Sequence, residues 1–267
     1  MRELLYDFRR YFEQLKDDGV SMVETTHQPY AGENPAPRKR PSADSRHPQP
    51  VTKSVPVPPS KRIEKIQRHE GRAGSPGTKS TLPAESFRIL TERINNCHNC
   101  GLSTTRNCAV PGEGGNDLRI LFVGEGPGAE EDRQGRPFVG RSGQLLDKIL
   151  AAVSLTRKDI FITNIVKCRP PGNRDPLSEE VIACWPYLEE QIKILQPRVI
   201  VTLGAPAAKT LLDTSTGIGR LRGRFHDYHG IPLLPTYHPA YLLRSYTLEN
   251  RKKVWEDMKL LMEFIKD

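Results

Sequence analysis

Residues 119–132, with the sequence RILFVGEGPGAEED, decide the fold class of this chain. Residues 120–123 form an unbroken apolar run, which is typical of a strand buried on both faces of a sheet. The glycines that follow indicate a tight turn directly after this strand. Three further apolar runs have the same character and are also expected to be strands: 160–164, 199–203 and 231–235.

Apolar residues at helical spacing predict helices around these strands, at 85–95, 142–153, 178–195, 205–212 and 250–265. Strands that alternate with helices predict an α/β fold, in which helices cover both faces of a mainly parallel sheet. Ligands of such sheets bind in the crevice beyond the carboxyl ends of the strands. The residues that directly follow each strand are therefore the first candidates for a functional site.

The charge of the chain is unevenly distributed. Its 267 residues include 40 Lys and Arg against 32 Asp and Glu, which gives a formal net charge of +8. Residues 1–29 carry −2, residues 30–80 carry +7 and residues 81–267 carry +3. A basic excess suits a polyanionic partner such as nucleic acid, and most of the excess lies ahead of the predicted strands.

Three regions are predicted along the chain. Residues 1–20 have apolar residues at helical spacing and are expected to form an amphipathic helix, which either docks on the folded domain or binds a protein partner. Residues 21–82 are rich in Pro and in basic residues, and they lack a periodic apolar pattern. We expect a disordered tether there, because the segment cannot bury enough apolar surface to offset its ordering entropy. Residues 83–267 are long enough for one folded domain.

Nothing in the sequence indicates a membrane or secreted protein. No stretch approaches the roughly 18 apolar residues of a membrane span, and the N-terminus has no signal-peptide apolar region. The five cysteines are odd in number and do not resemble a secreted disulfide framework. We therefore expect a cytoplasmic protein that does not bind membranes and acts as a monomer.

Polar residues lie at or just after the ends of three predicted strands: Glu125, Asn164 and His238. The glycine-rich loop after the first strand is not a typical phosphate site, because its acidic residues would repel a pyrophosphate and no Gly-Lys-Ser/Thr follows. Each of the three residues taken singly is more often structural, but three strand ends together favour a binding site. Phe138, flanked by glycine and proline residues, either presents its ring to a planar ligand or fills the core.

The cysteines form a second candidate site. Cys97 and Cys100 are a close pair, and Cys168 and Cys184 follow as distant single residues. Four thiolates fit either zinc or an iron–sulfur cluster. Zinc sites usually use two close pairs, so the wide spacing favours iron–sulfur but leaves zinc and buried free thiols open. Cys108 would be a fifth ligand and is expected to lie outside the set.

Taken together, these motifs resemble those of the family 4 uracil-DNA glycosylases of bacteria and archaea. The matching segments are GEGPGAEED at 124–132, GRPFVGRSG at 135–143, NIVKCRPPGNR at 164–174 and HPAYLLR at 238–244. The spacing of the four cysteines is similar as well. The resemblance covers about residues 83–267, departs at Gly126, where relatives often have alanine, and says nothing about the preceding residues.

The resemblance implies a three-layer α/β/α fold with a four-stranded, mainly parallel sheet. It implies a [4Fe-4S] cluster, remote from the chemistry, held by Cys97, Cys100, Cys168 and Cys184. The implied activity is hydrolysis of the N-glycosidic bond of deoxyuridine in DNA, which releases uracil and leaves an abasic site. The related covalent uracil binders carry an extra basic loop after the third matching segment; residues 172–176 lack it, so turnover is expected.

The resemblance also implies how the base is recognised once it has been flipped out of the duplex. Phe138 would stack on the uracil ring, and Asn164 would pair with O4 and N3–H. Glu131 would exclude the methyl group of thymine. Gly124 and Gly126 would let the backbone approach the substrate, because glycine has no side chain.

Further roles concern the reaction and the DNA. His238 would donate to uracil O2 and stabilise the departing anion, while Glu125 and Asn173 are candidates to position the attacking water. The implied partner is uracil-containing DNA. Four residues are expected to contact it, three at phosphates and the leucine as a wedge in the vacated base stack: Arg174, Arg222, Arg244 and Leu242.

Two other functions remain open from the sequence. The first is a non-catalytic iron–sulfur module of the same fold that binds nucleic acid, against which Glu125, Asn164 and His238 argue. The second is a nucleotide hydrolase scaffolded by zinc, which would be colourless because zinc is d¹⁰.

Overall fold

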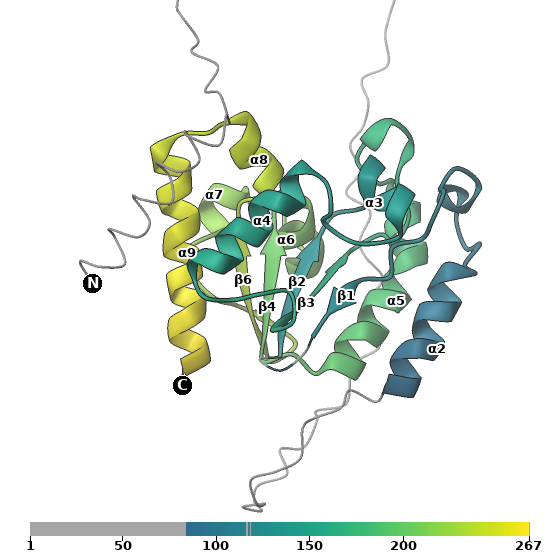
Figure 1. The fold of residues 1–267 in the computed structure, drawn as a ribbon, viewed down its shortest axis with the longest axis horizontal. Coiled ribbons are helices and arrows are strands. Elements are labelled where there is room, and N and C mark those ends of the chain that lie inside the picture. The colour runs from purple at the N-terminus through teal and green to yellow at the C-terminus, as the bar shows by residue number, and fades with distance from the viewer. Residues whose placement is uncertain (1–83, 116, 118, 267) are drawn as a thin grey trace, which may run out of the picture. The chain divides into compact units, whose positions relative to one another are not determined.

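The structure, a computed structural model, describes residues 84–115, 117 and 119–266 (Figure 1). The helix predicted at 1–20 and the tether predicted at 21–82 lie outside these residues. The helices of the described part are α2 (Ala84–Asn95), α3 (Ala129–Gln134), α4 (Arg141–Ala152), α5 (Ser178–Leu195), α6 (Ala205–Leu212), α7 (Ile218–Leu221), α8 (Pro239–Arg244) and α9 (Leu248–Lys266), with 3₁₀ turns η1 (Gly101–Thr104) and η2 (Pro171–Asn173).

The strands are β1 (Glu113–Gly114), β2 (Ile120–Gly124), β3 (Ile160–Asn164), β4 (Val199–Leu203), β5 (His226–Tyr228) and β6 (Ile231–Thr236). They form one sheet in the order β1-β3-β2-β4-β6-β5. The four central strands pair in parallel, whereas β1 and β5 add antiparallel edges. The described sheet is therefore six-stranded and mixed, and the expectation of four strands was wrong. The predicted four are its parallel centre.

Helices cover both faces of the sheet, as the alternation of strands and helices predicted (Figure 1). Leu121 and Val123 of β2 point to a core shared with α2, α5 and α6. Ile120 and Phe122 point to the opposite core, which α4, α8 and α9 close. Successive residues of β2 thus serve both layers, which explains why this strand is apolar at every position.

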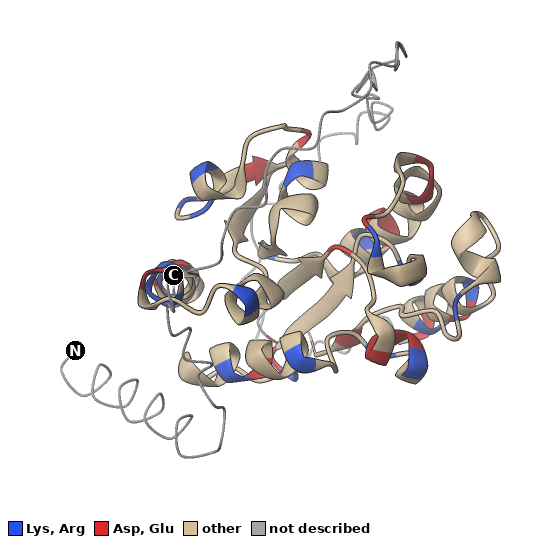
Figure 2. Cartoon of the chain, turned by 90° about the horizontal axis from the view of Figure 1, so that it is seen from above, with Lys and Arg blue, Asp and Glu red and all other residues tan. Residues whose placement is uncertain are grey.

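The four parallel strands contain no Lys, Arg, Asp or Glu, and charged residues of both signs lie on the surrounding helices and loops (Figure 2). Helix α5 begins at Ser178, with Leu177 as its N-cap, and the carboxylate of Glu180 accepts the Leu177 amide at 2.7 Å. No helix among residues 84–266 is long and apolar enough to cross a bilayer.

Candidate active site

A cavity of about 270 Å³ opens beyond the carboxyl ends of β2, β3 and β6. This is where ligands of open α/β sheets bind, and its volume lies at the small end for ligand cavities. Most of the residues predicted for the site line this cavity: Glu125, Gly126, Glu131, Phe138, Asn164, Asn173, Arg174, His238 and Arg244. Gly124 and Leu242 are not part of its lining.

Asn164 is the most deeply placed polar residue of the cavity. It ends β3, and only 1% of its surface is exposed. Its Oδ1 has no hydrogen-bond partner among the described residues. A buried acceptor without a partner costs about 1–3 kcal/mol, so this side chain is suited to a ligand that donates a hydrogen bond.

Gly124 makes room for that side chain, although it does not line the cavity. A Cβ at this position would lie 2.4 Å from Asn164 Oδ1 and 2.6 Å from Phe138 Cζ. Any other residue at 124 would therefore displace the amide and the aromatic ring together. In the structure Gly124 leaves space for these two side chains, and its predicted approach to the substrate stays a prediction.

Phe138 lies beside the amide, at the border between the cavity and the core. It lines the cavity, and it is also packed into the core under α4, with 5% of its surface exposed. Its ring stacks on that of His238, with centroids 5.6 Å apart and planes 30° from parallel. The backbone of Phe138 is in the left-handed region, at φ 53°, which is uncommon for a bulky residue.

His238 follows β6 and caps α8. Its Nδ1 accepts the Ala240 amide at 3.0 Å, so the proton of a neutral ring resides on Nε2. Burial, and then the positive charge of Arg244, lower the pKa of His238 to about 4. At neutral pH the ring is therefore uncharged and has an Nε2–H available to donate.

Glu125 is half-buried in the loop after β2. Burial, and then the negative charge and hydrogen bonding of Asp175, raise its pKa to about 7. Asp175 also lines the cavity and was not among the predicted residues. The signal was its place directly after the motif that ends in Asn173-Arg174. A carboxyl that titrates near neutral pH is suited to proton transfer or to orienting water.

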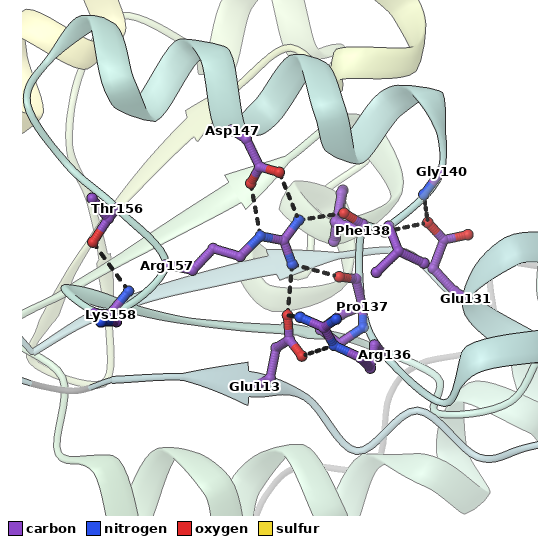
Figure 3. Close-up of polar contacts among 11 residues, drawn as sticks. Glu113, Glu131, Arg136, Pro137, Phe138, Gly140, Asp147, Thr156, Arg157 and Lys158 are labelled. Carbon is purple, nitrogen blue, oxygen red and sulfur yellow. Dashed lines mark hydrogen bonds and ion pairs between the residues drawn. The ribbon is translucent and has the colours of Figure 1, made fainter.

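Glu131 is buried and firmly held. Its Oε1 accepts the amides of Val139 and Gly140 at 2.9 and 2.8 Å. Figure 3 shows the carboxylate facing this segment of the loop after α3. The side chain therefore forms a fixed wall of the cavity and also ties down the two residues that follow Phe138.

The loop after β3 supplies two exposed residues with partners of their own. Asn173 Oδ1 accepts from Arg169 Nε at 2.7 Å, so this oxygen is already engaged. Arg174 makes a two-pronged ion pair with Glu180, at 2.6 and 2.9 Å, and lies at the rim of the cavity.

Two of the residues predicted to contact DNA are mostly buried in this structure. Leu242 is only 2% exposed and packs in the core, so it cannot act as a wedge in this conformation. Tyr241 and Leu243 on either side are the exposed apolar residues, at 36% and 38%. The Arg222 side chain is only 11% exposed, and its guanidinium pairs with the buried Asp257 at 2.8 Å.

A second cavity is lined by four of the five cysteines: Cys97, Cys100, Cys168 and Cys184. Three of the sulfurs accept N–H groups, from Asn99, from Arg106 at 3.0 Å and from the Lys167 amide at 3.3 Å. Cys108 is exposed and lies outside this lining, as expected. Among residues 84–266, no His, Cys, Asp and Glu side chains converge closely enough for a single metal ion.

Lys167 lines the second cavity and was not singled out by sequence. It is 1% exposed, and its Nζ donates to Asn164 O, Thr163 Oγ1 and Gln191 Oε1 at 2.6–2.7 Å. Its side chain therefore holds the end of β3, while its amide binds a cysteine sulfur. Burial lowers the pKa of Lys167 to about 8.

Comparison with known proteins gives a consistent result. Residues 111–259 match the family model of the uracil DNA glycosylase superfamily. A type-4 uracil-DNA glycosylase of Thermotoga maritima is 47% identical over 184 residues, which is 68% of this chain and 96% of the relative. A type-4 uracil-DNA glycosylase of Pyrobaculum aerophilum is 48% identical over 58% of this chain and 84% of the relative. A type-5 uracil-DNA glycosylase of the same organism is less similar, with 33% identity over 50% of this chain and 66% of the relative.

Proposed function

The chain belongs to the uracil-DNA glycosylase superfamily and within it to the type-4 enzymes, and we propose that it excises uracil from DNA. The reaction hydrolyses the N-glycosidic bond of a flipped-out deoxyuridine and leaves an abasic site. The observation that carries the proposal is the unpartnered, buried Oδ1 of Asn164 beside the Phe138 ring. It is an acceptor without a donor at the place where a planar base would enter.

The amide of Asn164 would read the base edge. Its Oδ1 would accept from uracil N3–H and its Nδ2 would donate to O4. Cytosine presents an acceptor and a donor in the reverse order, which would leave the amide unsatisfied at a cost of about 1–3 kcal/mol. The Phe138 ring would stack on the base, and the fixed carboxylate of Glu131 would exclude the methyl group of thymine.

His238 would stabilise the leaving group. Breaking the bond places negative charge on uracil, and the neutral imidazole offers Nε2–H toward O2. A donor fixed before the reaction pays little reorganisation cost as charge develops, which is how oxyanion holes act. The sugar acquires oxocarbenium character, and the Glu125 carboxylate would orient the water that attacks it. Asn173 is the weaker candidate, because Arg169 already engages its oxygen.

The DNA backbone would be held at the rim of the same cavity. Arg244 and Arg174 both line the cavity, so both can meet phosphates next to the flipped nucleotide. Tyr241 and Leu243 are the exposed apolar residues of α8, and we assign them the wedge position first given to Leu242. The basic residues between 30 and 80 would add non-specific, salt-dependent affinity for DNA.

The four cysteines around the second cavity are the donor set of the [4Fe-4S] cluster that the sequence resemblance implies. Cys97, Cys100, Cys168 and Cys184 would hold it, and the N–H groups donated to their sulfurs are of the kind that stabilise such clusters. When bound, the cluster would supply a cross-link between the segment after α2, the segment after β3, and α5. Four thiols around one cavity also favour a cytoplasmic, reducing environment. We propose a monomer, with a possible protein partner for residues 1–20.

The proposal is tested with oligonucleotides that carry a single uracil, cytosine or thymine, followed by alkaline cleavage of abasic sites. We expect strand breaks at uracil alone, and Asn164→Asp should gain activity on cytosine, because a protonated carboxyl can present the reversed pattern. Uracil DNA that is bound but never cleaved at stoichiometric protein would favour the non-catalytic binding module. A colourless protein containing zinc would contradict the cluster.

A further inference from the structure

The loop that carries Phe138 is held from behind by a single arginine. Arg157 lies in the turn before β3. It does not line the cavity beyond the carboxyl ends of β2, β3 and β6, which we call the base cavity. Its Nη1 donates to Pro137 O at 2.9 Å, and its Nη2 donates to Phe138 O. Figure 3 shows the guanidinium between these two carbonyls and two carboxylates.

The two carboxylates orient the guanidinium. Asp147 Oδ1 accepts from Arg157 Nε at 2.7 Å, and Glu113 Oε1 accepts from Nη1 at the same distance. Asp147 Oδ2 receives a longer, 3.4 Å bond from Nη2. The planar fork of arginine is therefore fully used, with its direction fixed by Asp147 and Glu113. The side chain is only 22% exposed.

The backbone that Arg157 grips would not hold this shape unaided. Phe138 is in the left-handed region, which costs free energy for a bulky residue and persists only where neighbours enforce it. The first turn of α4 packs directly on it, since a Cβ at Gly143 would lie 1.7 Å from Phe138 O. Glu131 binds the next two amides. Four successive residues, 137–140, are thus clamped through their backbone by two charged side chains.

We propose that Arg157 is a positioning residue for base recognition: it fixes the strained Phe138 backbone so that the ring presents its face to the flipped uracil. The inference rests on the proposed function, because only a protein that binds a flipped uracil has a base for the Phe138 ring to stack on. Lysine at 157 would keep the charge beside Glu113 and Asp147, but its single ammonium lacks the fork that reaches both carbonyls. Arg157→Lys therefore separates positioning from charge.

A double-mutant cycle between Arg157 and Phe138 tests the proposal. Excision of uracil and anisotropy binding of an oligonucleotide with non-cleavable 2′-fluorodeoxyuridine are measured for Arg157→Lys, Phe138→Ala and the double variant. We expect Arg157→Lys to lower kcat/KM and binding by about 10- to 100-fold. In the Phe138→Ala background the same change should cost less than about twofold, because the ring it positions is gone. Arg136→Ala is the matched control, because Arg136 pairs with the same Glu113 but binds neither carbonyl.

Equal losses in both backgrounds, or no loss in either, would overturn the positioning role. If Arg157→Lys fails to fold by thermal melting, Asp147→Ala replaces it, since Asp147 orients the guanidinium through Nε at 2.7 Å and its side chain is 47% exposed. It should show the same dependence on Phe138. If the unmodified protein excises no uracil, the proposed function fails, and the cycle is then read from binding of the fluorinated oligonucleotide alone.

Discussion

The segment after β3 contributes to two cavities that are built in opposite ways. In the base cavity, Asn164 leaves a buried oxygen unpartnered, and the pKa values of Glu125 and His238 are displaced toward 7 and 4. In the cysteine cavity, sulfurs already accept N–H groups from neighbouring residues. The unpartnered oxygen in the base cavity costs free energy until a ligand binds it. The cysteine sulfurs, in contrast, already have hydrogen-bond donors before any ligand binds.

The difference indicates that the base cavity is built for reversible binding and the cysteine cavity for a permanently held group. A site that binds and releases a base needs polar groups that are satisfied only in the complex. A permanently held group needs ligands fixed by a surrounding shell of hydrogen bonds. Substitutions in the base cavity should therefore affect rate more than stability, and substitutions in the cysteine cavity should do the reverse.

The largest effect is expected on the cysteine side. Cys184→Ser should abolish the visible absorbance of the purified protein and lower its melting temperature by about 10 °C or more, or ~3–5 kcal/mol for a domain of this size. Cys108→Ser, at the exposed cysteine outside the cavity, should change neither. Absorption spectra and thermal melts check both variants. A Cys184→Ser protein that keeps its colour would remove this residue from the ligand set.

On the other side of the comparison, His238→Ala should lower kcat by about 10²- to 10³-fold, or ~2.7–4 kcal/mol, by analogy with the loss of an oxyanion-hole donor. Its melting temperature should fall by only a few degrees, because the substitution also removes the side-chain cap of α8, at a cost of about 0.5–2 kcal/mol. Single-turnover excision and a thermal melt separate the two effects. His229→Ala, in the β5–β6 turn, is the matched control.

The parts of the fold that sequence could predict are those with continuous apolar patterns. The parallel strands and the long helices carry enough buried residues to be seen, and α5 ends at Leu195, as predicted. Edge strands β1 and β5 have two and three residues, with polar or glycine positions, so they lack a period. Helices α3, α7 and α8 have only six, four and six residues.

The site divides along a similar line. Residues at strand ends were predictable because parallel topology brings those ends together. Arg157 and Lys167 were not predictable from the sequence. Both bind backbone carbonyl oxygens, and the sequence does not show which carbonyls the folded chain brings next to them. Arg157 reaches carbonyls 19 and 20 residues away in sequence. The choice between Leu242 and its exposed neighbours depended on which face of a six-residue helix is buried.

Lys167 offers a way to test whether the two regions are separate. Lys167→Met would leave the oxygens of Asn164, Thr163 and Gln191 without their buried donor, for a loss of about 1–3 kcal/mol in the free energy of unfolding. Because Asn164 O is one of them, excision should fall as well. Urea unfolding and kcat/KM check the two losses. Lys158→Met, at an exposed lysine, is the control, and equal behaviour of the two variants would contradict a link between the cavities.

The smallest and most specific effect concerns pH. The pKa of Glu125 is raised to about 7, so if its carboxylate orients water, kcat should fall about tenfold per pH unit below 7. The stability effect has the opposite sign. A carboxyl whose pKa is higher in the folded state than in the unfolded state stabilises the fold at low pH, and this contribution is lost as pH rises through 7. Glu125→Gln should therefore flatten the pH–rate profile between pH 5 and 8 and should melt higher than the unmodified protein at about pH 8 but not at about pH 5. A profile that stays unchanged in Glu125→Gln would assign the titrating group to another residue.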